Sequence, residues 1–435
     1  MLSLIILIIE VTLLHVIKTM GIVRIDNNLA SILIFVFSIS FVASVQNSIR
    51  IKGYSKQIVA GYALRILLLY FDLFGNSIRT LPQSGADTMM FYGAAERWAL
   101  YDIESGRGFF VYVMWRVFEF IGVNRLYSQF LLMLFSIASL ILFVLIIEEL
   151  VFNDKTKERA AWILCLLPNF ALLSSIFLRE SIVTFLITIS VYFFIKWSRG
   201  RGTIFFLFAV LLSVSGCLFH SGCIGITIGY VICSLLYDPY EQKIHASLNG
   251  VILAFVFALG MAFLFLNYGD SLLGKFTRME TMKDIANTRS GAGSSYVQYV
   301  GNSNNPVNML IFTIPRIVYF LFSPFPWQWR GIADIIAFFF SGLFYLITIR
   351  NAIGYLNSKK QENREIIICL LIVAFFCTFI FAWGVSNTGT ASRHRDKMVC
   401  LYGIIYALTS NARTIIQENR NAKLINGNQK SYIYQ

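Results

Sequence analysis

The chain has few charged residues for its length. Asp, Glu, Lys and Arg make up 14% of its 435 residues, whereas about 25% is usual for a soluble globular protein. Hydrophobic residues make up 57% of the chain, so too little polar surface remains to cover a water-soluble body of this size. This composition excludes a soluble enzyme.

Three further features are missing. The first apolar run begins at Met1 without a cationic head, and no small-residue cleavage pattern follows it, so we expect a retained membrane span rather than a removed signal peptide. No internal repeat, coiled-coil heptad or low-complexity tract stands out, which predicts a single membrane domain over residues 1–410. The cysteines lie in or beside apolar runs, which is typical of neither a disulfide framework nor a metal site. They are Cys165, Cys217, Cys223, Cys233, Cys369, Cys377 and Cys400.

The apolar residues form long uninterrupted runs. Many of these runs reach roughly 17 to 25 residues, the length that a helix needs to cross ~30 Å of hydrocarbon, and fourteen apolar segments can be distinguished. The sequence therefore predicts an all-α, polytopic integral membrane protein. Short loops rich in Lys and Arg stay on the cytoplasmic side. The basic stretches that must share that side are 50–56, 155–159, 196–201, 350–364 and the tail 411–435.

An odd number of crossings must separate an outer loop from the next basic stretch on the cytoplasmic side. In two places the apolar segments between them are even in number, so one segment in each place is not expected to span. The segment 109–123 is short and carries Arg116 and Glu119 one turn apart, which is costly in hydrocarbon. The segment 307–325 contains prolines and Arg316, and proline removes backbone donors that lipid cannot replace. We therefore expect about 12 transmembrane helices, cytoplasmic termini and two non-spanning elements on the outer side.

This topology leaves two long outer segments, 76–123 and 267–330, and cations are numerous in them although positive charge is normally depleted there. The planar fork of arginine pairs bidentately with phosphate oxygens, so arginines at the lipid boundary suit an anionic headgroup such as a polyprenyl diphosphate. The alternative is that each arginine pairs with a local carboxylate or reaches lipid phosphate. The cations that break the charge rule are Arg65, Arg79, Arg97, Arg107, Arg116, Arg179, Lys275, Arg278, Lys283, Arg289, Arg316, Arg330, Arg393, Arg395 and Lys397.

Three outer residues are candidates for proton transfer. Glu180 follows Arg179 in a tight turn between two apolar runs, where the neighbouring cation makes it a weak base, and a salt bridge at a helix start is the alternative. His220 lies in a similar turn and exchanges protons near neutral pH, with a structural hydrogen bond as the alternative. Asp87 lies in the first outer loop and is also a candidate helix N-cap. We expect His220 to accept the proton and Glu180 to orient an arginine.

The outer turn 386–397 carries the most specific local pattern in the chain. It contains Arg393, Arg395 and Lys397 beside one acid, at the mouth of the last apolar run. Three cations so placed are costly unless an anion binds them. Nucleotide binding is not expected, because the glycine-rich stretch 289–296 lacks the strand and helix context of a phosphate-binding fingerprint.

Several short motifs, in their order along the chain, resemble those of bacterial oligosaccharide repeat-unit polymerases of the O-antigen type. The resemblance covers most of the chain in layout. It implies a multi-pass protein of the bacterial inner membrane with a C-type glycosyltransferase-like fold. The motifs are Gly85-Ala86-Asp87 with Tyr92 and Glu96-Arg97-Trp98, the turn from Pro168 to Glu180, Phe219-His220-Ser221, Ser323-Pro324-Phe325-Pro326-Trp327, and Arg393-His394-Arg395.

Such enzymes transfer a glycan from undecaprenyl diphosphate to the terminal sugar of the next lipid-linked repeat unit, on the periplasmic side. The resemblance implies that the partners are undecaprenyl-diphosphate-linked oligosaccharide and membrane lipids, with a chain-length regulator protein as a further candidate. It implies no metal, no other cofactor and no nucleic acid. The catalytic candidates are then Asp87, Glu180 and His220. The residues expected to bind diphosphate or glycan are Arg179, Arg278, Arg289, Arg316, Arg393, Arg395 and Trp327.

Two other functions are compatible with the same residues. A C-type transferase that uses a polyprenyl-monophosphate sugar would employ Asp87 as its base, and its donor would carry a single sugar. A flippase for lipid-linked oligosaccharide would place basic residues deep in many spans and show symmetry between two halves. Here the unusual cations gather at the outer ends of spans, so transport ranks third.

Overall fold

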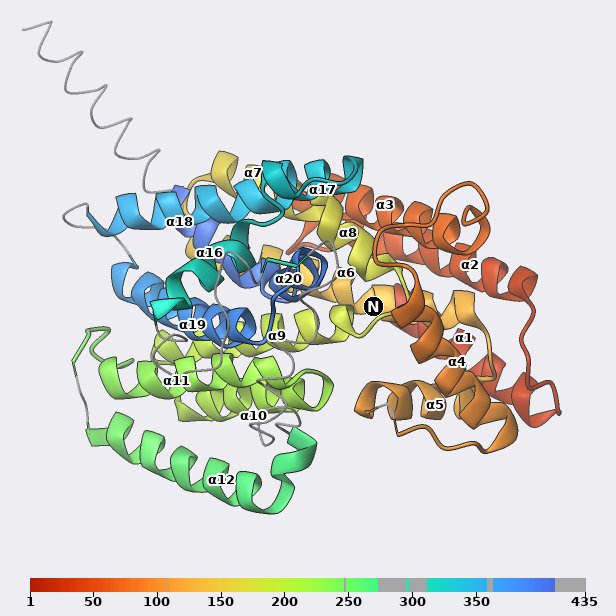
Figure 1. The fold of residues 1–435 in the computed structure, drawn as a ribbon, viewed down its shortest axis with the longest axis horizontal. Coiled ribbons are helices and arrows are strands. Elements are labelled where there is room, and N and C mark those ends of the chain that lie inside the picture. The colour runs from red at the N-terminus through yellow and green to blue at the C-terminus, as the bar shows by residue number, and fades with distance from the viewer. Residues whose placement is uncertain (107, 246–247, 273–294, 297–310, 358–362, 411–435) are drawn as a thin grey trace, which may run out of the picture.

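The computed structural model shows an almost entirely helical chain (Figure 1). Within the described residues, the β-type contacts are isolated bridges, such as the one between Arg24 and Val123. The basic tail 411–435 and two of the predicted phosphate ligands, Arg278 and Arg289, lie outside the described residues. The structure describes residues 1–106, 108–245, 248–272, 295–296, 311–357 and 363–410.

Seven helices of the described residues are long and apolar enough to cross a membrane. This confirms the polytopic, all-α membrane protein expected from the sequence, whereas the number of 12 spans stays a prediction. These seven are α1 (Leu2–Thr19), α2 (Asn27–Gln46), η1 with α3 (Lys52–Phe74), α6 (Arg125–Leu150), α9 (Glu180–Ser198), α17 with η4 and α18 (Ile332–Leu356), and α19 (Arg364–Trp383).

The remaining helices include both apolar and polar segments. Two of them, α7 and α8, divide one apolar stretch, because Pro168 begins α8 and lacks the N–H that would continue α7. These helices are α4 (Ala86–Tyr101), α5 (Phe109–Ile121), α7 (Asp154–Leu166), α8 (Pro168–Ser175), α10 (Thr203–Phe219), η2 (Ser221–Cys223), α11 (Ile224–Leu236), α12 (Leu248–Leu272), α16 (Thr313–Phe322), η3 (Pro326–Gln328), α20 (Thr388–Asp396) and the helix Val399–Ser410.

The long helices pack closely at the centre of the bundle. α9 packs against α6 and α10, and α11 packs against α19. Two glycines of α11 allow the second contact, since an added Cβ would lie 2.6 Å from the carbonyl oxygen of Phe376 at Gly225 and 2.7 Å from the Cα of Val373 at Gly229. Small residues let two membrane helices approach in this way.

Basic residues gather at one end of the bundle, around two acids at the end of α6. Glu149 pairs with Lys196 at 2.9 Å and with Arg201 at 2.6 Å. Glu148 pairs with Lys157 at 3.1 Å. Two of the basic stretches predicted to be cytoplasmic therefore share this end of the molecule.

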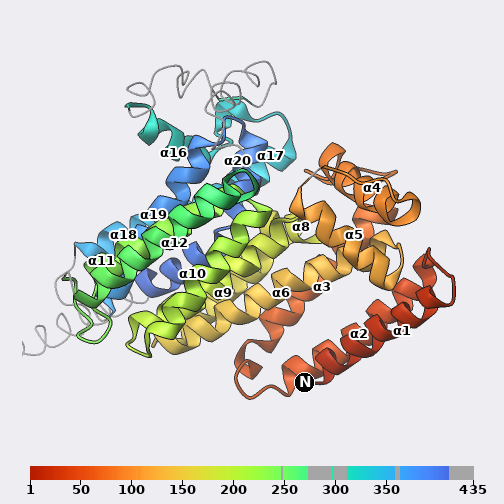
Figure 2. The same ribbon diagram turned by 90° about the horizontal axis from the view of Figure 1, so that it is seen from below.

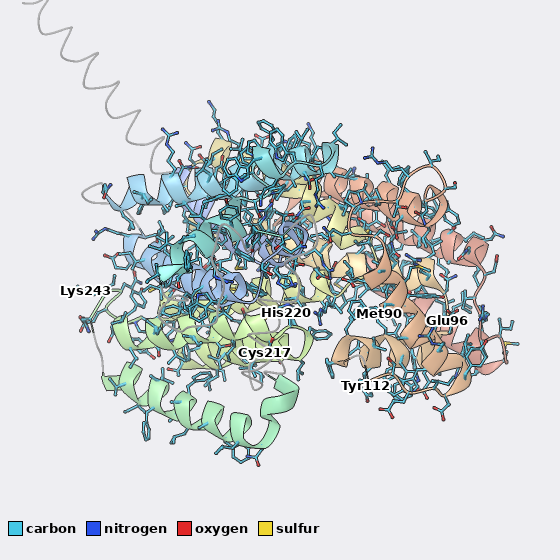
Figure 3. All side chains as sticks on the ribbon, viewed as in Figure 1. Met90, Glu96, Tyr112, Cys217, His220 and Lys243 are labelled. Atoms are coloured by element: carbon cyan, nitrogen blue, oxygen red, sulfur yellow. The ribbon has the colours of Figure 1, made fainter. Side chains whose placement is uncertain are left out.

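The opposite end carries the short helices. Figure 2 shows α4, α5, α8, α16, α17 and α20 gathered there, with the long helices running away from them. Figure 3 shows His220 and Lys243 beyond opposite ends of α11, so His220 belongs to the end with the short helices. The polar turns that the sequence predicts to be external thus meet at one end.

Two of these short helices occupy the segments predicted not to span. α5 has 13 residues and is about 20 Å long at ~1.5 Å per residue, which is less than the ~30 Å of a hydrocarbon core. Its Arg116 and Glu119 form an ion pair on the exposed face. α16 has 10 residues and is shorter still. Because α11 has the same length as α5, length alone does not decide which helices span, and the non-spanning roles of 109–123 and 307–325 stay predictions.

Cysteine labelling tests the expected sidedness. The native cysteines are all buried, so an impermeant maleimide should label the wild-type chain weakly. With single substitutions in intact cells, Ser77→Cys and Ser105→Cys should react from outside, whereas Asn47→Cys and Lys155→Cys should react only after the membrane is opened. Labelling of Lys155→Cys in sealed cells would contradict the topology.

Candidate functional site

The polar centre of the molecule is built on α20. Asn387 caps this helix, because its side-chain oxygen accepts hydrogen bonds from the backbone N–H groups of Gly389 at 2.8 Å and Thr390 at 3.3 Å. The backbone N–H of Tyr296 donates to the carbonyl of Ser386 at 2.9 Å. The helix begins where these contacts hold it, and its basic last turn points toward α4, α8 and α9.

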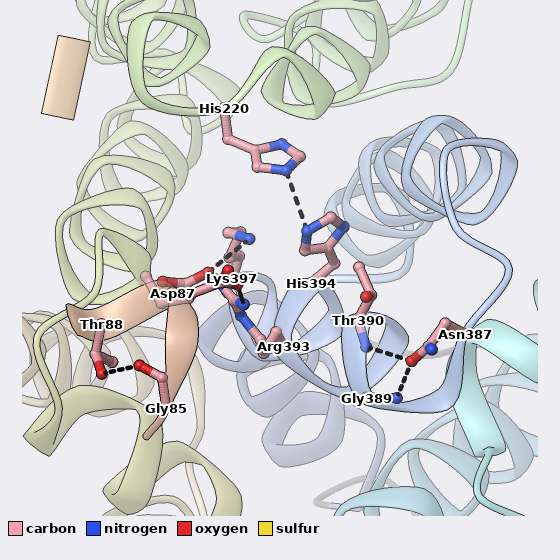
Figure 4. Close-up of polar contacts among 11 residues, drawn as sticks. Gly85, Asp87, Thr88, His220, Asn387, Gly389, Thr390, Arg393, His394 and Lys397 are labelled. Carbon is pink, nitrogen blue, oxygen red and sulfur yellow. Dashed lines mark hydrogen bonds and ion pairs between the residues drawn. The ribbon is translucent and has the colours of Figure 1, made fainter. Parts of the chain in front are cut away.

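Arg393 joins two carboxylates from distant parts of the chain (Figure 4). Its Nη1 forms an ion pair with Asp87 at the start of α4, and its Nη2 donates to Glu180 Oε1 at 3.0 Å. The side chain of Arg393 is 12% exposed and that of Glu180 is 3% exposed, whereas Asp87 is 50% exposed. Arg393 therefore lies between a buried acid and an acid at the surface.

Lys397 completes the cluster around Glu180. Its Nζ lies 3.4 Å from Glu180 Oε1, and its side chain is fully buried. Burial lowers the pKa of Lys397 to about 8, although the Glu180 carboxylate acts in the opposite direction. Glu180 Oε2 is also buried and has no hydrogen-bond partner among the described residues. The Glu180 carboxylate thus contacts two cations through Oε1, while its Oε2 makes no hydrogen bond to the described residues.

Arg179 adds a third cation next to Glu180. Its guanidinium lies over the ring of Phe91 at 5.8 Å, and its Nε is buried without a hydrogen-bond partner among the described residues. Burial lowers the pKa of Arg179, the Glu180 carboxylate raises it, and Arg393 lowers it further. A buried guanidinium with unmet donors attracts an anion.

Two histidines meet beside these cations. His220 Nε2 lies 3.2 Å from His394 Nε2, and His220 Nδ1 accepts a hydrogen bond from the backbone of Gly222 at 3.1 Å. Neutral His220 must therefore carry its proton on Nε2 and donate it to His394. Burial, the cations Lys397, Arg393 and Arg179, and the neighbouring His220 hold the pKa of His394 well below its usual range, which keeps His394 a neutral acceptor.

A second buried acid, Asp396, follows His394 on α20. Asp396 Oδ2 accepts from the Asn169 amide at 2.8 Å, and Asn169 in turn accepts from the hydroxyl of Ser392 at 3.2 Å. Burial raises the pKa of Asp396 to about 7. This network fixes α8 against α20 and so positions the basic turn.

The structure separates Arg395 from Arg393. Arg395 is fully buried, and its Nη1 donates to main-chain carbonyls at the end of α16, including that of Leu321 at 3.0 Å, while its Nε donates to the Ser341 hydroxyl at 3.1 Å. Its guanidinium is therefore engaged with α16 and η4. Arg395 was expected to bind diphosphate; its Nε and Nη1 donate to protein groups, whereas its Nη2 is buried without a hydrogen-bond partner among the described residues, so this role stays a prediction.

Two other predicted site residues lie on neighbouring elements. Arg316 on α16 is buried, and α16 contacts α20, but no described contact joins Arg316 to Glu180 or Arg393. Trp327 is 62% exposed and stacks on Phe325 with ring centroids 4.8 Å apart. Of the predicted residues, the structure brings together Asp87, Arg179, Glu180, His220 and Arg393.

The sequence analysis named Lys397 among the cations of the turn 386–397 but did not include it among the site residues, and it assigned no role to His394, Asn169 or Asp396. Lys397 follows Arg393 by four residues, and residues four apart share one face of a helix. That spacing could have indicated Lys397 if the turn had been read as a helix. The contacts of Asn169 and His394 join segments far apart in sequence, so no local pattern indicates them.

The cluster is suited to binding an anion next to a proton acceptor. Three cations, Arg179, Arg393 and Lys397, surround the buried Glu180, and Asp87 borders them at the surface. Among the described residues, no group of three His, Cys, Asp or Glu side chains could hold a metal ion. The charges of the side chains themselves are thus what the site offers an anionic ligand.

Comparisons with known proteins return no relative for this chain. No family model matches it, and neither a curated protein nor a solved structure matches it.

The buried position of Glu180 predicts a large effect on stability. Glu180→Gln removes the charge that balances Lys397 and Arg393, so the free energy of unfolding should fall by about 3 kcal/mol, as when one partner of a buried pair is lost. The matched control is Glu119→Gln, whose ion pair with Arg116 is exposed and should contribute less than about 1 kcal/mol. Thermal unfolding in detergent compares the two, and equal shifts would contradict the role of Glu180.

Proposed function

We propose that the protein is a membrane glycosyltransferase that joins polyprenyl-diphosphate-linked oligosaccharide repeat units on the outer face of a bacterial inner membrane. The observation that carries this proposal is the meeting of Arg179, Arg393 and Lys397 around Glu180, beside the half-exposed Asp87. A lipid diphosphate brings concentrated negative charge to the membrane boundary, where this cluster lies. The resemblance to O-antigen-type polymerases points to the same substrate.

The path of the described chain is compatible with 12 crossings, whereas the C-type glycosyltransferase-like fold that we propose rests on the resemblance in sequence. In this count α7 and α8 form one crossing, α17 to α18 form another, and α4, α5 and α16 stay at the site end. The first hairpin closes through a hydrogen bond from Ser3 N to Ser44 Oγ at 3.1 Å. The last helix ends beside α18, where Asn351 donates to Ser410 Oγ at 3.0 Å. The start of α1 and Ser410, the last described residue, then lie at the end that gathers the basic stretches.

The first chemical task is to bind the leaving group. Arg393 and Arg179 present guanidinium donors that can pair with phosphate oxygens, and arginine does so bidentately. Preorganised cations stabilise the charge that develops as a diphosphate leaves. Glu180 keeps Arg393 and Lys397 in place without itself meeting the substrate, because it is buried beneath them.

The second task is to accept a proton from the sugar hydroxyl, and the geometry favours Asp87 over His220. Both ring nitrogens of His220 are engaged, Nδ1 with the backbone of Gly222 and Nε2 with His394. Asp87 is half exposed and its partner is Arg393. A diphosphate that takes over Arg393 releases the Asp87 carboxylate for proton transfer.

The transfer step then balances as follows. The acceptor hydroxyl loses its proton to the Asp87 carboxylate, and its oxygen forms a bond to the anomeric carbon of the donor. The bond between that carbon and the phosphate oxygen breaks, and its electron pair leaves with the diphosphate. Arg179, Arg393 and Lys397 neutralise the anion, so no acid is needed for the leaving group.

One alternative uses the same residues. A transferase with a polyprenyl-monophosphate sugar donor would also employ an exposed carboxylate, Asp87, beside cations. The two functions differ in their products, because a polymerase yields a ladder of chain lengths and the alternative adds one sugar to its acceptor.

A reconstitution assay tests the polymerase. Purified protein in lipid, given undecaprenyl-diphosphate repeat units, should yield a ladder of chain lengths. Asp87→Asn should abolish the ladder, since general-base catalysis contributes roughly 100- to 10,000-fold, whereas His220→Ala should keep at least a tenth of the rate, roughly, at equal expression. A single addition from a monophosphate donor would favour the alternative, and loss of activity in His220→Ala alone would contradict the role of Asp87.

Arg393 tests the phosphate-binding role. Arg393→Lys keeps the charge but loses the bidentate fork, so polymerisation should slow by more than about tenfold, or ~1.4 kcal/mol. The matched control is Arg116→Lys, because Arg116 lies on the exposed face of α5. An unchanged ladder in the Arg393 variant would remove this residue from the phosphate site.

A further inference from the structure

An apolar cavity lies beside the charged cluster, between α5, α6 and α9. Its volume is about 480 Å³, within the ~300–1,000 Å³ range of ligand sites. Ser128 is the one polar residue in its wall, and the hydroxyl of Ser128 donates to the carbonyl of Asn124 at 2.8 Å. The wall therefore offers hydrocarbon surface without a free polar group.

The cavity borders the cluster at two points. Its wall residues Met114 and Ile182 pack in the apolar cluster that includes Phe91, and the guanidinium of Arg179 lies over the Phe91 ring at 5.8 Å. Phe219 also lines it and directly precedes His220. An amphiphile with its charged head at Arg393 could thus place its chain in the cavity.

The helix α5 forms the outer wall of this cavity. Its buried side chains follow a helical stripe, and its Val113 and Val117 line the cavity. Phe109, at the start of α5, packs edge-on against Phe219 with ring centroids 5.1 Å apart. Figure 3 shows Tyr112 on α5 and His220 beyond α10, the two elements that this aromatic contact joins. The helix α5, which we expect not to span the membrane, therefore covers this cavity.

A second apolar cavity, between α10 and α12, provides a comparison. Its volume is about 420 Å³ and its wall is also apolar, with Val214 and Gly260 among its residues. No residue of the charged cluster lies beside it in sequence. Size and hydrophobicity alone therefore do not distinguish the two cavities, whereas the first has wall residues that pack with Phe91, the ring under the Arg179 guanidinium.

We propose that the cavity between α5, α6 and α9 binds the polyprenyl chain of the lipid-linked substrate, with the diphosphate held at Arg393 and Arg179. This inference rests on the proposed function, because it takes the substrate to be a polyprenyl diphosphate. The apolar wall then binds the polyprenyl chain by excluding water from it. The cations of the cluster bind the diphosphate head by charge.

The experiment uses the full chain in phosphatidylcholine nanodiscs and a sugar-free polyprenyl diphosphate with a diazirine on its isoprenoid chain. After irradiation, the labelled peptides should contain α5 and the first turns of α9. Val117→Trp, which fills the cavity, should reduce labelling by about tenfold or more. The matched control Val214→Trp, in the comparison cavity, should leave labelling unchanged.

Labelling spread over the lipid-facing helices, or equal labelling in both variants, would overturn the proposal and indicate ordinary contact with bulk lipid. Equal competition by a phosphatidylcholine chain probe would do the same. If the Val117→Trp variant unfolds, the labelled peptides of the wild-type protein still decide the test, because only binding in the cavity concentrates label on α5 and the first turns of α9. The probe carries no sugar, so this test does not depend on polymerisation. Labelling at α5 together with no polymer ladder in the reconstitution assay would refute the polymerase alone. A ladder together with dispersed labelling would refute the cavity alone.

Discussion

A single buried carboxylate, that of Glu180, holds the polar end of this molecule together. Glu180 is the first residue of α9. Its carboxylate accepts a hydrogen bond from Arg393 and lies next to Lys397, so it joins the first turn of a central helix to the last turn of α20. Burying charge is costly unless a partner of opposite sign is held close. The position of α20, and with it that of the two histidines, therefore depends on this carboxylate staying ionised and enclosed.

The geometry of α20 then decides which cation serves which purpose. Arg393 and Lys397 are four residues apart and share one face, toward Glu180, whereas Arg395 is two residues from each and faces away. Arg395 instead binds carbonyls at the end of α16. One short helix thus directs Arg393 and Lys397 toward Glu180 on one side and anchors α16 through Arg395 on the other.

This division explains how far the sequence could predict the site. The apolar runs predict the membrane helices because their length is set by the bilayer, and the charge rule placed the outer turns at one end. The segment 386–397 lacks an apolar stripe, so it reads as a turn, and Arg393 and Arg395 then appear equivalent. Asp87 and Arg393 are 306 residues apart, and only the packing of α4 against the bundle brings them together.

In the function that we propose, Arg393 also links the binding of the diphosphate to the transfer of the proton. Its two partners differ in exposure, since Glu180 is enclosed and Asp87 reaches the surface. An arriving anion competes with Asp87 for the guanidinium but leaves the Glu180 contact in place. The arginine then keeps its position, the buried charge stays balanced, and the exposed carboxylate gains the freedom to accept a proton. In such an arrangement the base is released only when the leaving group is already bound, which couples proton transfer to the presence of the donor.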